Sequence, residues 1–232
     1  MRVLALWRYP VKSMQGEPLD QVGVGDLGLA GDRAYGVLDP ATGLVLTARR
    51  HPALLHGAGR HGPDGSIEVL LPDGSVADGD EALSAWLGRP VRLERAGTGV
   101  EPTYESDDRE RWGGPAGAFH DDGSVRVSLV GTATVGRLGD WDLRRFRPNI
   151  VVDGDEEDGL VGRRVRLGSA ILDVVQPVVR CVMVTRLQPG GIARDLDVLR
   201  TILRERAGTL AVGAVVIRAG TIAVGDEIEV LT

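Results

Sequence analysis

Cysteine, lysine and asparagine each occur only once among the 232 residues of this sequence. A single cysteine excludes an internal disulfide and every metal-binding motif that needs paired cysteines. Aromatic residues make up only 4% of the chain, whereas apolar residues make up 43%. We therefore expect a core built from Val, Leu, Ile and Ala, in a chain long enough to fold without covalent cross-links.

A secretory leader and a long apolar run are also missing. No N-terminal stretch combines a basic segment, an apolar run and a small-residue cleavage site, and no apolar run is long enough to span a bilayer. The net charge of −6 disfavours nonspecific nucleic-acid binding, which needs a broad basic surface. We expect a soluble, cytoplasmic protein with neither a membrane nor a nucleic acid as a partner.

The three singly occurring residues lie in distinctive short segments: Lys12 in YPVKS, Asn149 in RFRPN and Cys181 in VVRC. Lysine offers a flexible point charge that arginine cannot copy, asparagine offers an uncharged donor and acceptor, and cysteine alone offers a thiolate. We interpret these positions as candidate site residues. The alternative is chance survival in a sequence biased towards arginine and glycine.

Short β-branched or alternating apolar runs, separated by Gly and Asp, predict a mainly β protein with a few helices. The 33 glycines suit the bends that curl sheets, so we expect β-barrels rather than open sheets. The glycine-rich residues 23–31 lack the order of a phosphate-binding loop and are interpreted as turns. The predicted strands are residues 3–9, 34–38, 44–47, 67–71, 91–94, 125–130, 150–152, 165–167, 171–175, 182–186, 210–217 and 227–231.

Helical periodicity predicts three helices, over residues 81–87, 132–138 and 196–206. The third has an apolar stripe of Leu196, Leu199, Ile202 and Leu203 behind Asp195 as a candidate N-terminal cap. A Gly-, Pro- and charge-rich stretch over residues 95–122 shows no regular period and is interpreted as a connector. We expect an N-terminal domain over residues 1–95 and a C-terminal domain over residues 96–232.

Cys181 follows Arg180 and opens the apolar run Val182-Met183-Val184, which predicts a position at a strand end. A neighbouring guanidinium favours a thiolate over a thiol, so Cys181 is a candidate nucleophile or metal ligand. The alternative is a buried structural cysteine, because free cysteine is among the most buried residue types.

The segment RFRPN concentrates positive charge immediately before a predicted strand. Arginine binds oxyanions in a bidentate manner, so Arg147 with Asn149 suits a phosphate or carboxylate. The alternative is a solvated basic loop balanced by the acidic residues 153–158. Lys12 and Ser13 leave the first predicted strand together, and Arg33 precedes the second. Both segments lie where loops carry functional groups on a rigid scaffold.

Taken in order along the chain, these segments resemble the MOSC-domain family, the molybdenum-cofactor-sulfurase C-terminal domains. The resemblance rests on YPVKS, GDR, FHDDGSVRVSLVGTATV, RFRPNI, VVRC and the closing GTIAVGDEIEVL. It extends over nearly the whole chain, and among its relatives the sequence is similar to the amidoxime-reducing components. It implies an N-terminal β-barrel domain followed by a MOSC β-barrel.

The resemblance also implies a molybdenum cofactor, molybdopterin, and a set of residues that bind it. The cysteine matching Cys181 is a molybdenum ligand in the family, and thiolate is the soft donor that such a metal needs. Residues 128–134 match a wall of the pterin pocket. The resulting cofactor-binding residues are Lys12, Ser13, Arg33, Ser128, Thr132, Arg147, Asn149, Arg180 and Cys181, with Cys181 also as the catalytic residue.

On this basis we expect a molybdenum-dependent reductase of N-hydroxylated small molecules. The four-cysteine iron–sulfur extension of some bacterial relatives is not in this sequence, so we expect a separate electron-donor protein. Two alternatives stay open: a sulfur carrier that uses a persulfide on Cys181, and a cofactor-binding module without turnover.

Overall fold

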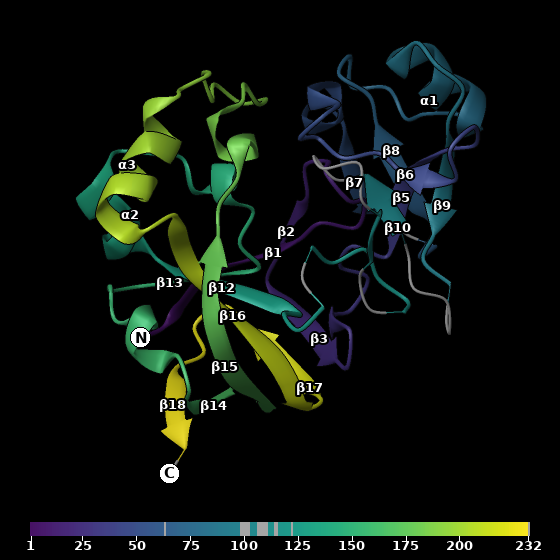
Figure 1. Ribbon diagram of the computed structural model, residues 1–232. Coiled ribbons are helices and arrows are strands. Elements are labelled where there is room, and N and C mark those ends of the chain that lie inside the picture. Colours follow the sequence, from purple (N-terminus) through teal and green to yellow (C-terminus); the bar gives the residue numbers. More distant parts are fainter. Residues whose placement is uncertain (63, 98–102, 106–110, 114–115, 122, 232) are drawn as a thin grey trace. The chain divides into compact units, whose positions relative to one another are not determined.

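The computed structural model describes residues 1–232 except 63, 98–102, 106–110, 114–115, 122 and 232 (Figure 1). The chain forms two compact units. Unit 1 comprises residues 1–7, 18–30 and 124–232, and unit 2 comprises residues 8–17 and 31–123. Strands dominate and three α-helices lie among the described residues, which confirms the mainly β prediction.

The largest sheet is curled and has eight strands in the order β18-β14-β15-β16-β12-β13-β1-β2 (Figure 1). Its neighbours are antiparallel at β14–β15, β15–β16, β12–β16 and β1–β13 and parallel at β12–β13. The bounds are β1 Val3–Arg8, β2 Glu17–Leu19, β12 Val127–Gly131, β13 Ile150–Val152, β14 Arg164–Leu167, β15 Ala170–Val179, β16 Thr209–Arg218 and β18 Ile228–Leu231.

A second sheet of unit 1 contains β3 (Gln21–Gly25), β4 (Gly28–Leu29) and β17 (Gly220–Ala223). The prediction of turns alone over residues 23–31 is therefore wrong. Gly23 and Gly25 lie in β3, where Gly23 faces Thr221 of β17 across the ladder. Valines 22 and 24 alternate with these glycines and are buried, so the strand has one apolar face despite its composition.

The main core of unit 1 is aliphatic, as the composition predicts. It combines residues from β1 and β3 with residues from the C-terminal half, because β1 pairs with β13 and β3 pairs with β17. Its fully or almost fully buried members include Leu6, Leu29, Ile150, Leu167 and Leu172. The core of unit 1 therefore depends on segments far apart in the sequence.

The three predicted helices are confirmed as α1 (Gly79–Leu87), α2 (Thr132–Leu138) and α3 (Asp197–Arg206). The predicted N-cap of α3 is wrong: Leu196 is the N-cap residue and no side chain caps the helix, although Asp195 Oδ1, one residue earlier, accepts a 2.8 Å hydrogen bond from the amide of Asp197. The predicted apolar stripe of α3 is wrong in part. Val198 and Ile202 are buried against the second core of unit 1, whereas Leu196 and Leu203 are 43% and 57% exposed.

The predicted strand over residues 182–186 is instead a 3-10 turn, η4 (Val182–Thr185). The amide of Val184 donates to the carbonyl of Cys181 at 3.2 Å, and Thr185 Oγ1 donates to the carbonyl of Val182 at 2.8 Å. The last ladder pair between β15 and β16 is Val179 with Thr209, the first residue of β16. The chain beyond Val179 therefore loses its partner strand, and local hydrogen bonds replace the ladder.

Unit 2 contains a five-stranded sheet in the order β11-β10-β6-β5-β9 and a hairpin of β7 with β8. Two of these strands, β10 and β11, lie within the predicted connector, so residues 95–122 contain regular structure. The bounds are β5 Tyr35–Asp39, β6 Leu44–Val45, β7 Ala58–His61, β8 Ile67–Leu70, β9 Arg92–Arg95, β10 Thr103–Glu105 and β11 Arg111–Gly113. Besides η4, the 3-10 turns of the described residues are η1 Pro52–His56 in unit 2 and η2 Leu143–Phe146 and η3 Glu157–Leu160 in unit 1.

Across the described part of the chain, no helix has both the length and the apolar character needed to cross a membrane.

Candidate functional site

Cys181 lies two residues beyond the end of β15, in an extended conformation before η4, and not at the start of the strand expected over residues 182–186. It is half-buried, so it differs from a structural cysteine sealed in a core. The described residues contain no group of three or more His, Cys, Asp or Glu side chains that could hold a metal ion together.

Arg180 connects the Cys181 segment to two other parts of unit 1. Its Nε donates to the carbonyl of Leu210 at 2.7 Å, and its Nη1 donates to the carbonyl of Phe146 at 2.8 Å. The guanidinium carbon also lies 5.8 Å from the centre of the Phe146 ring. Arg180 therefore ties the chain next to Cys181 to the RFRPN segment through two backbone carbonyls.

The Leu210 carbonyl reaches Arg180 because β16 carries a bulge. Between Val212 and Thr209 the register with β15 shifts, and Ala211 in this interval has φ 77°. A left-handed conformation is unfavourable for a residue with a Cβ. The bulge redirects a strand carbonyl from the ladder to the Arg180 guanidinium, as bulges near functional sites commonly do.

The RFRPN segment begins in η2, which Asp142 caps. Asp142 Oδ1 accepts from the amide of Arg144 at 2.9 Å, and both carboxylate oxygens accept from the Arg144 guanidinium. These bonds hold the pKa of Asp142 below its ordinary value, mainly through the hydrogen bond from the Arg144 side chain. Arg147 ends η2 with φ 50° and is 8% exposed. The segment is therefore an ordered, buried turn and not a solvated loop.

Asn149 and Ser128 bind each other. Asn149 Oδ1 accepts from the Ser128 amide at 3.1 Å and from Ser128 Oγ at 3.2 Å. Asn149 Nδ2 donates to the carbonyl of Trp7 at 3.3 Å. The side chain of Asn149 thus joins β12, β13 and β1, which gives the single asparagine a structural function that the sequence did not indicate.

Thr132 begins α2 and is partly buried, whereas Thr134, two residues further, is almost fully buried. Thr134 Oγ1 donates to Oε2 of Glu157 at 2.7 Å. Glu157 was not among the predicted residues, because a glutamate within an acidic run gives no sign in the sequence that it is buried.

Lys12, in unit 2, is 3% exposed and held by groups from the connector. Its Nζ donates to the carbonyl of Phe119 at 3.2 Å, forms an ion pair with Asp121, and lies 4.0 Å from the centre of the Tyr104 ring. The Tyr104 hydroxyl donates to the backbone carbonyl of Asp121 at 3.1 Å. Of the three residues that contact Lys12 Nζ, Asp121 has the exposed side chain, with an exposed fraction of 78%.

Arg33 forms an ion pair with its neighbour Asp32, whose side chain is fully buried and also accepts from the amide of Tyr9 at 2.7 Å. Burial lowers the pKa of Arg33, but the charges of Asp32 and Asp121 and the hydrogen bond to Asp32 outweigh burial and raise the pKa above its ordinary value. Lys12 and Arg33 are also joined through Phe119, whose amide donates to the Arg33 carbonyl at 2.7 Å.

Ser13 is buried, and its Oγ accepts from the amide of Ala48 at 3.0 Å. Ser13, Arg33 and Arg147 have φ of 70°, 52° and 50°. In the described part of the chain only two other non-glycine residues have positive φ, Ala207 and Ala211. Such backbone strain concentrates at functional sites. It supports these three positions with a signal independent of the sequence motifs.

The predicted residues are thus brought together within each unit. In unit 1, Arg180 joins the Cys181 segment to the end of η2 beside Arg147, while Asn149 is bound to Ser128. In unit 2, Lys12 and Arg33 share Phe119, and Ser13 directly follows Lys12. Sequence reasoning missed the carboxylates of Asp32, Asp121 and Glu157, although Asp32 is adjacent to a predicted residue.

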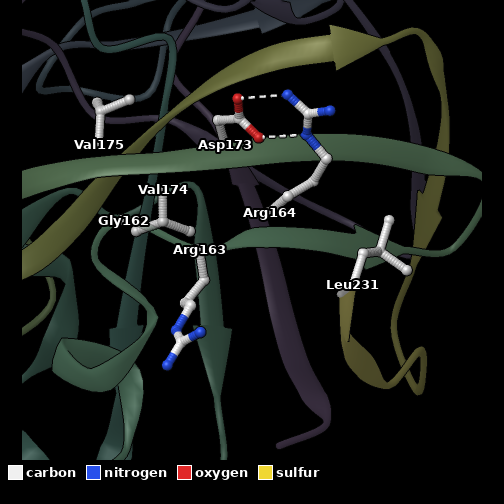
Figure 2. A pocket seen from close by; sticks show the side chains of 7 residues that line it. All are labelled: Gly162, Arg163, Arg164, Asp173, Val174, Val175 and Leu231. Atoms are coloured by element: carbon white, nitrogen blue, oxygen red, sulfur yellow. Dashed lines mark hydrogen bonds and ion pairs between the residues drawn. The ribbon is translucent and has the colours of Figure 1, made fainter.

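A separate depression of about 490 Å³ lies in unit 1 and contains none of the predicted residues. Arg164 donates to Asp173 through Nε at 2.7 Å and Nη2 at 2.9 Å, and this pairing raises the pKa of Arg164. Figure 2 shows the Arg163 side chain directed away from this pair. The residues that line the depression are Gly162, Arg163, Arg164, Asp173, Val174, Val175 and Leu231.

Fold and site define a mainly β protein with a half-buried thiol beside a buried basic turn. Comparison with known protein families identifies the family to which this protein belongs. The MOSC N-terminal beta barrel domain matches residues 1–93, and the MOSC domain matches residues 128–229. The chain belongs to the MOSC-domain family, whose members are associated with molybdenum-cofactor-related proteins.

Three solved structures are similar to this chain. YUAD protein from Bacillus subtilis is 14% identical with a TM-score of 0.52, over 99% of this chain and 94% of that one, which shows a shared fold. A hypothetical protein is 13% identical with a TM-score of 0.46, over 100% and 68%. YiiM from Geobacillus stearothermophilus is 14% identical with a TM-score of 0.40, over 59% and 74%. No curated protein matches the chain.

Proposed function

We propose that this protein binds the molybdenum cofactor and reduces N-hydroxylated small molecules with electrons from a separate donor protein. The observation that carries the proposal is the half-buried thiol of Cys181, which Arg180 ties to the buried RFRPN turn through the Phe146 carbonyl. A soft thiolate beside a fixed cationic turn suits a soft metal carried by a phosphorylated organic group.

The residues present fit such a cofactor. The described residues contain no set of His, Cys, Asp or Glu that could hold a metal without further ligands, so the single thiolate would complete a coordination sphere that the cofactor largely supplies. Arg147 is a buried cation in a strained turn, and Lys12 is a buried cation whose carboxylate partner is exposed. Each is a cation that, within its own unit, suits an anionic group.

When bound, the cofactor would supply the redox chemistry, in which an N–OH group takes up two electrons and two protons and yields N–H and water. The chain's own residues would bind and orient the cofactor. In unit 1, Cys181 would hold the metal, and Arg147 and Thr132 would contact polar groups of the cofactor. In unit 2, Lys12, Ser13 and Arg33 are candidates for binding an anionic group. Arg180, Ser128 and Asn149 would act chiefly by fixing the segments of unit 1 that carry these groups, through their hydrogen bonds to Leu210, Phe146 and each other.

Cys181→Ala and Cys181→Ser test the proposal. In protein from a host that makes the cofactor, we expect wild type to contain molybdenum and pterin and both variants to lose molybdenum while their β-type circular dichroism is unchanged. Stoichiometric metal in Cys181→Ala contradicts the ligand assignment. Wild type without molybdenum but with cyanide-releasable sulfur would instead support a sulfur carrier with a Cys181 persulfide. Cofactor without turnover would support a binding module.

Arg147→Lys tests the basic turn. The substitution keeps the charge but loses the planar fork, and charge-assisted hydrogen bonds contribute about 1.5–3 kcal/mol each, so we expect cofactor retention to fall about tenfold or more. Arg60→Lys is the control, because Arg60 is exposed and pairs with Glu68. Equal retention of cofactor in both variants, measured as pterin per protein, would exclude Arg147 as a phosphate ligand.

A further inference from the structure

Glu157 is a fully buried carboxylate outside the predicted set. It begins η3 and has an exposed fraction of 0%. Its Oε2 accepts a 2.7 Å hydrogen bond from Thr134 Oγ1, and its Oε1 is buried without a hydrogen-bond partner among the described residues. No ion pair of Glu157 occurs there either. Burying a carboxylate with one hydrogen bond is costly, so its presence needs a reason other than stability.

Glu157 packs against the connection from β12 to α2. A Cβ on Gly131 would come within 2.5 Å of Glu157 Oε2 and within 2.5 Å of the Gly154 carbonyl oxygen. The φ of Gly131 is −83°, which any residue adopts, so space and not backbone freedom requires glycine here. Glycine at this position lets the carboxylate approach the chain immediately before α2.

The same carboxylate lies where α2 lacks a cap. Gly131 is the N-cap residue and offers no side chain, and the amide of Ala133 donates to the Gly154 carbonyl at 2.9 Å. The first amides of a helix need acceptors, and a negative group near them is favourable. Glu157 and the Gly154 carbonyl therefore fix the first turn of α2 from the segment that follows β13.

We infer that Glu157 is a positioning residue that holds residues 131–134 in one conformation and thereby places Thr132 for ligand binding. The inference rests on the proposed function for the identity of that ligand. Glu157 touches neither Thr132 Oγ1 nor Cys181 in any hydrogen bond of the structure, and acts through Thr134 and Gly131. The Glu157 carboxylate acts as the hydrogen-bond acceptor for Thr134 Oγ1, and the side-chain amide oxygen of a glutamine at this position can accept the same bond.

Four variants separate positioning from general stability. Glu157→Met and Thr134→Val remove the hydrogen bond with little change in size, whereas Glu157→Gln and Thr134→Ser can keep it. Glu156→Gln is the control, because Glu156 is the exposed neighbour. Hydrogen–deuterium exchange of amides 131–135 is compared with that of β15 and β16, and molybdenum and pterin content is measured in the same preparations.

We expect Glu157→Met and Thr134→Val to raise exchange of amides 131–135 about tenfold, with β15 and β16 unchanged, and to lower cofactor retention by a similar factor. Glu157→Gln, Thr134→Ser and the control should stay within about twofold of wild type. Uniformly faster exchange, unchanged exchange at 131–135, or unchanged retention despite faster local exchange would each overturn the inference. If wild type holds no cofactor, the proposed function fails, and exchange alone still decides whether Glu157 fixes this connection.

Discussion

Lys12 and Arg33 are both buried cations with carboxylate partners, but those partners differ in exposure. Asp32 is fully buried and accepts from the Tyr9 amide as well, so it is fixed on Arg33. The Asp121 side chain is 78% exposed, and the Tyr104 hydroxyl donates to its backbone carbonyl. An incoming anion could therefore replace Asp121 on Lys12, whereas Arg33 would keep Asp32.

Asp121→Asn tests this competition. Because the pair is half-exposed, its contribution is at most about 1 kcal/mol, and we expect the affinity for inorganic phosphate to rise about two- to fivefold. Lys12→Ala should abolish the gain. Phosphate titration followed by calorimetry measures both variants. Weaker phosphate binding in Asp121→Asn would show that Asp121 supports the anion site instead of competing for it.

Asn149→Asp is expected to destabilise the protein even without a cofactor. The new carboxylate oxygen would take the place of Nδ2, which lies 3.3 Å from the Trp7 carbonyl, and would set two acceptors against each other. Leaving a buried polar group unsatisfied costs about 1–3 kcal/mol, and more when it is charged. We expect the free energy of unfolding in urea to fall by about 2–3 kcal/mol.

Ser128→Ala is the comparison for Asn149→Asp, since it removes the hydroxyl that bonds Asn149 Oδ1 and leaves the Nδ2 contact in place. We expect it to cost about 1 kcal/mol. If Asn149→Asp cost less than Ser128→Ala, the Trp7 contact would not fix this side chain.

At the scale of single elements, the end of α3 has a residue type that is unfavourable for its backbone conformation. Ala207 ends α3 with φ 51°, a position where glycine is usual, and the next residue, Gly208, donates to the Ile202 carbonyl at 3.1 Å. The left-handed conformation costs alanine about 1 kcal/mol, and glycine avoids this cost. Glycine loses part of that gain, because its unfolded chain has more conformational freedom.

We therefore expect Ala207→Gly to stabilise the protein by a few tenths of a kcal/mol up to about 1 kcal/mol. Ala133→Gly is the matched control, because Ala133 is exposed within α2 and the same change there should cost about 0.5–1 kcal/mol. Urea midpoints at constant m-value measure both. Destabilisation by Ala207→Gly would contradict the strained helix end.

At the scale of the whole molecule, unit 1 is discontinuous. Leu6 from β1 and Val22 and Val24 from β3 belong to the same core as Leu167 and Leu172, and β3 forms a ladder with β17. A fragment of residues 96–232 would expose this core and leave β13 and β17 with unpaired edges. The predicted division at residues 95 and 96 stays a prediction, which such a fragment tests.

We expect the 96–232 fragment to lack a cooperative thermal transition, whereas the full chain unfolds cooperatively, because small domains depend on the area that they bury. Co-expression with residues 1–95 should restore a soluble complex and is the control for a damaged fragment. A cooperative transition of the isolated fragment would show that β1 and β3 are dispensable.

The sequence by itself determined what local pattern controls. Periodicity located α1, α2 and α3, because a helix is held by hydrogen bonds between residues four apart. The ordered segments from YPVKS to VVRC identified the MOSC family, and the sequence has one position, Cys181, that can offer a thiol.

Tertiary structure decided what distant partners control. Residues 182–186 have strand-forming composition, yet β16 offers no pairing beyond Val179, so local bonds formed η4. Residue composition also cannot show that Lys12 forms an ion pair with Asp121, or that Glu157 is buried against Gly131. Burial and pairing depend on which segments fold together. A strand and a buried charge are each defined by a partner far away in the sequence, and only the assembled fold supplies that partner.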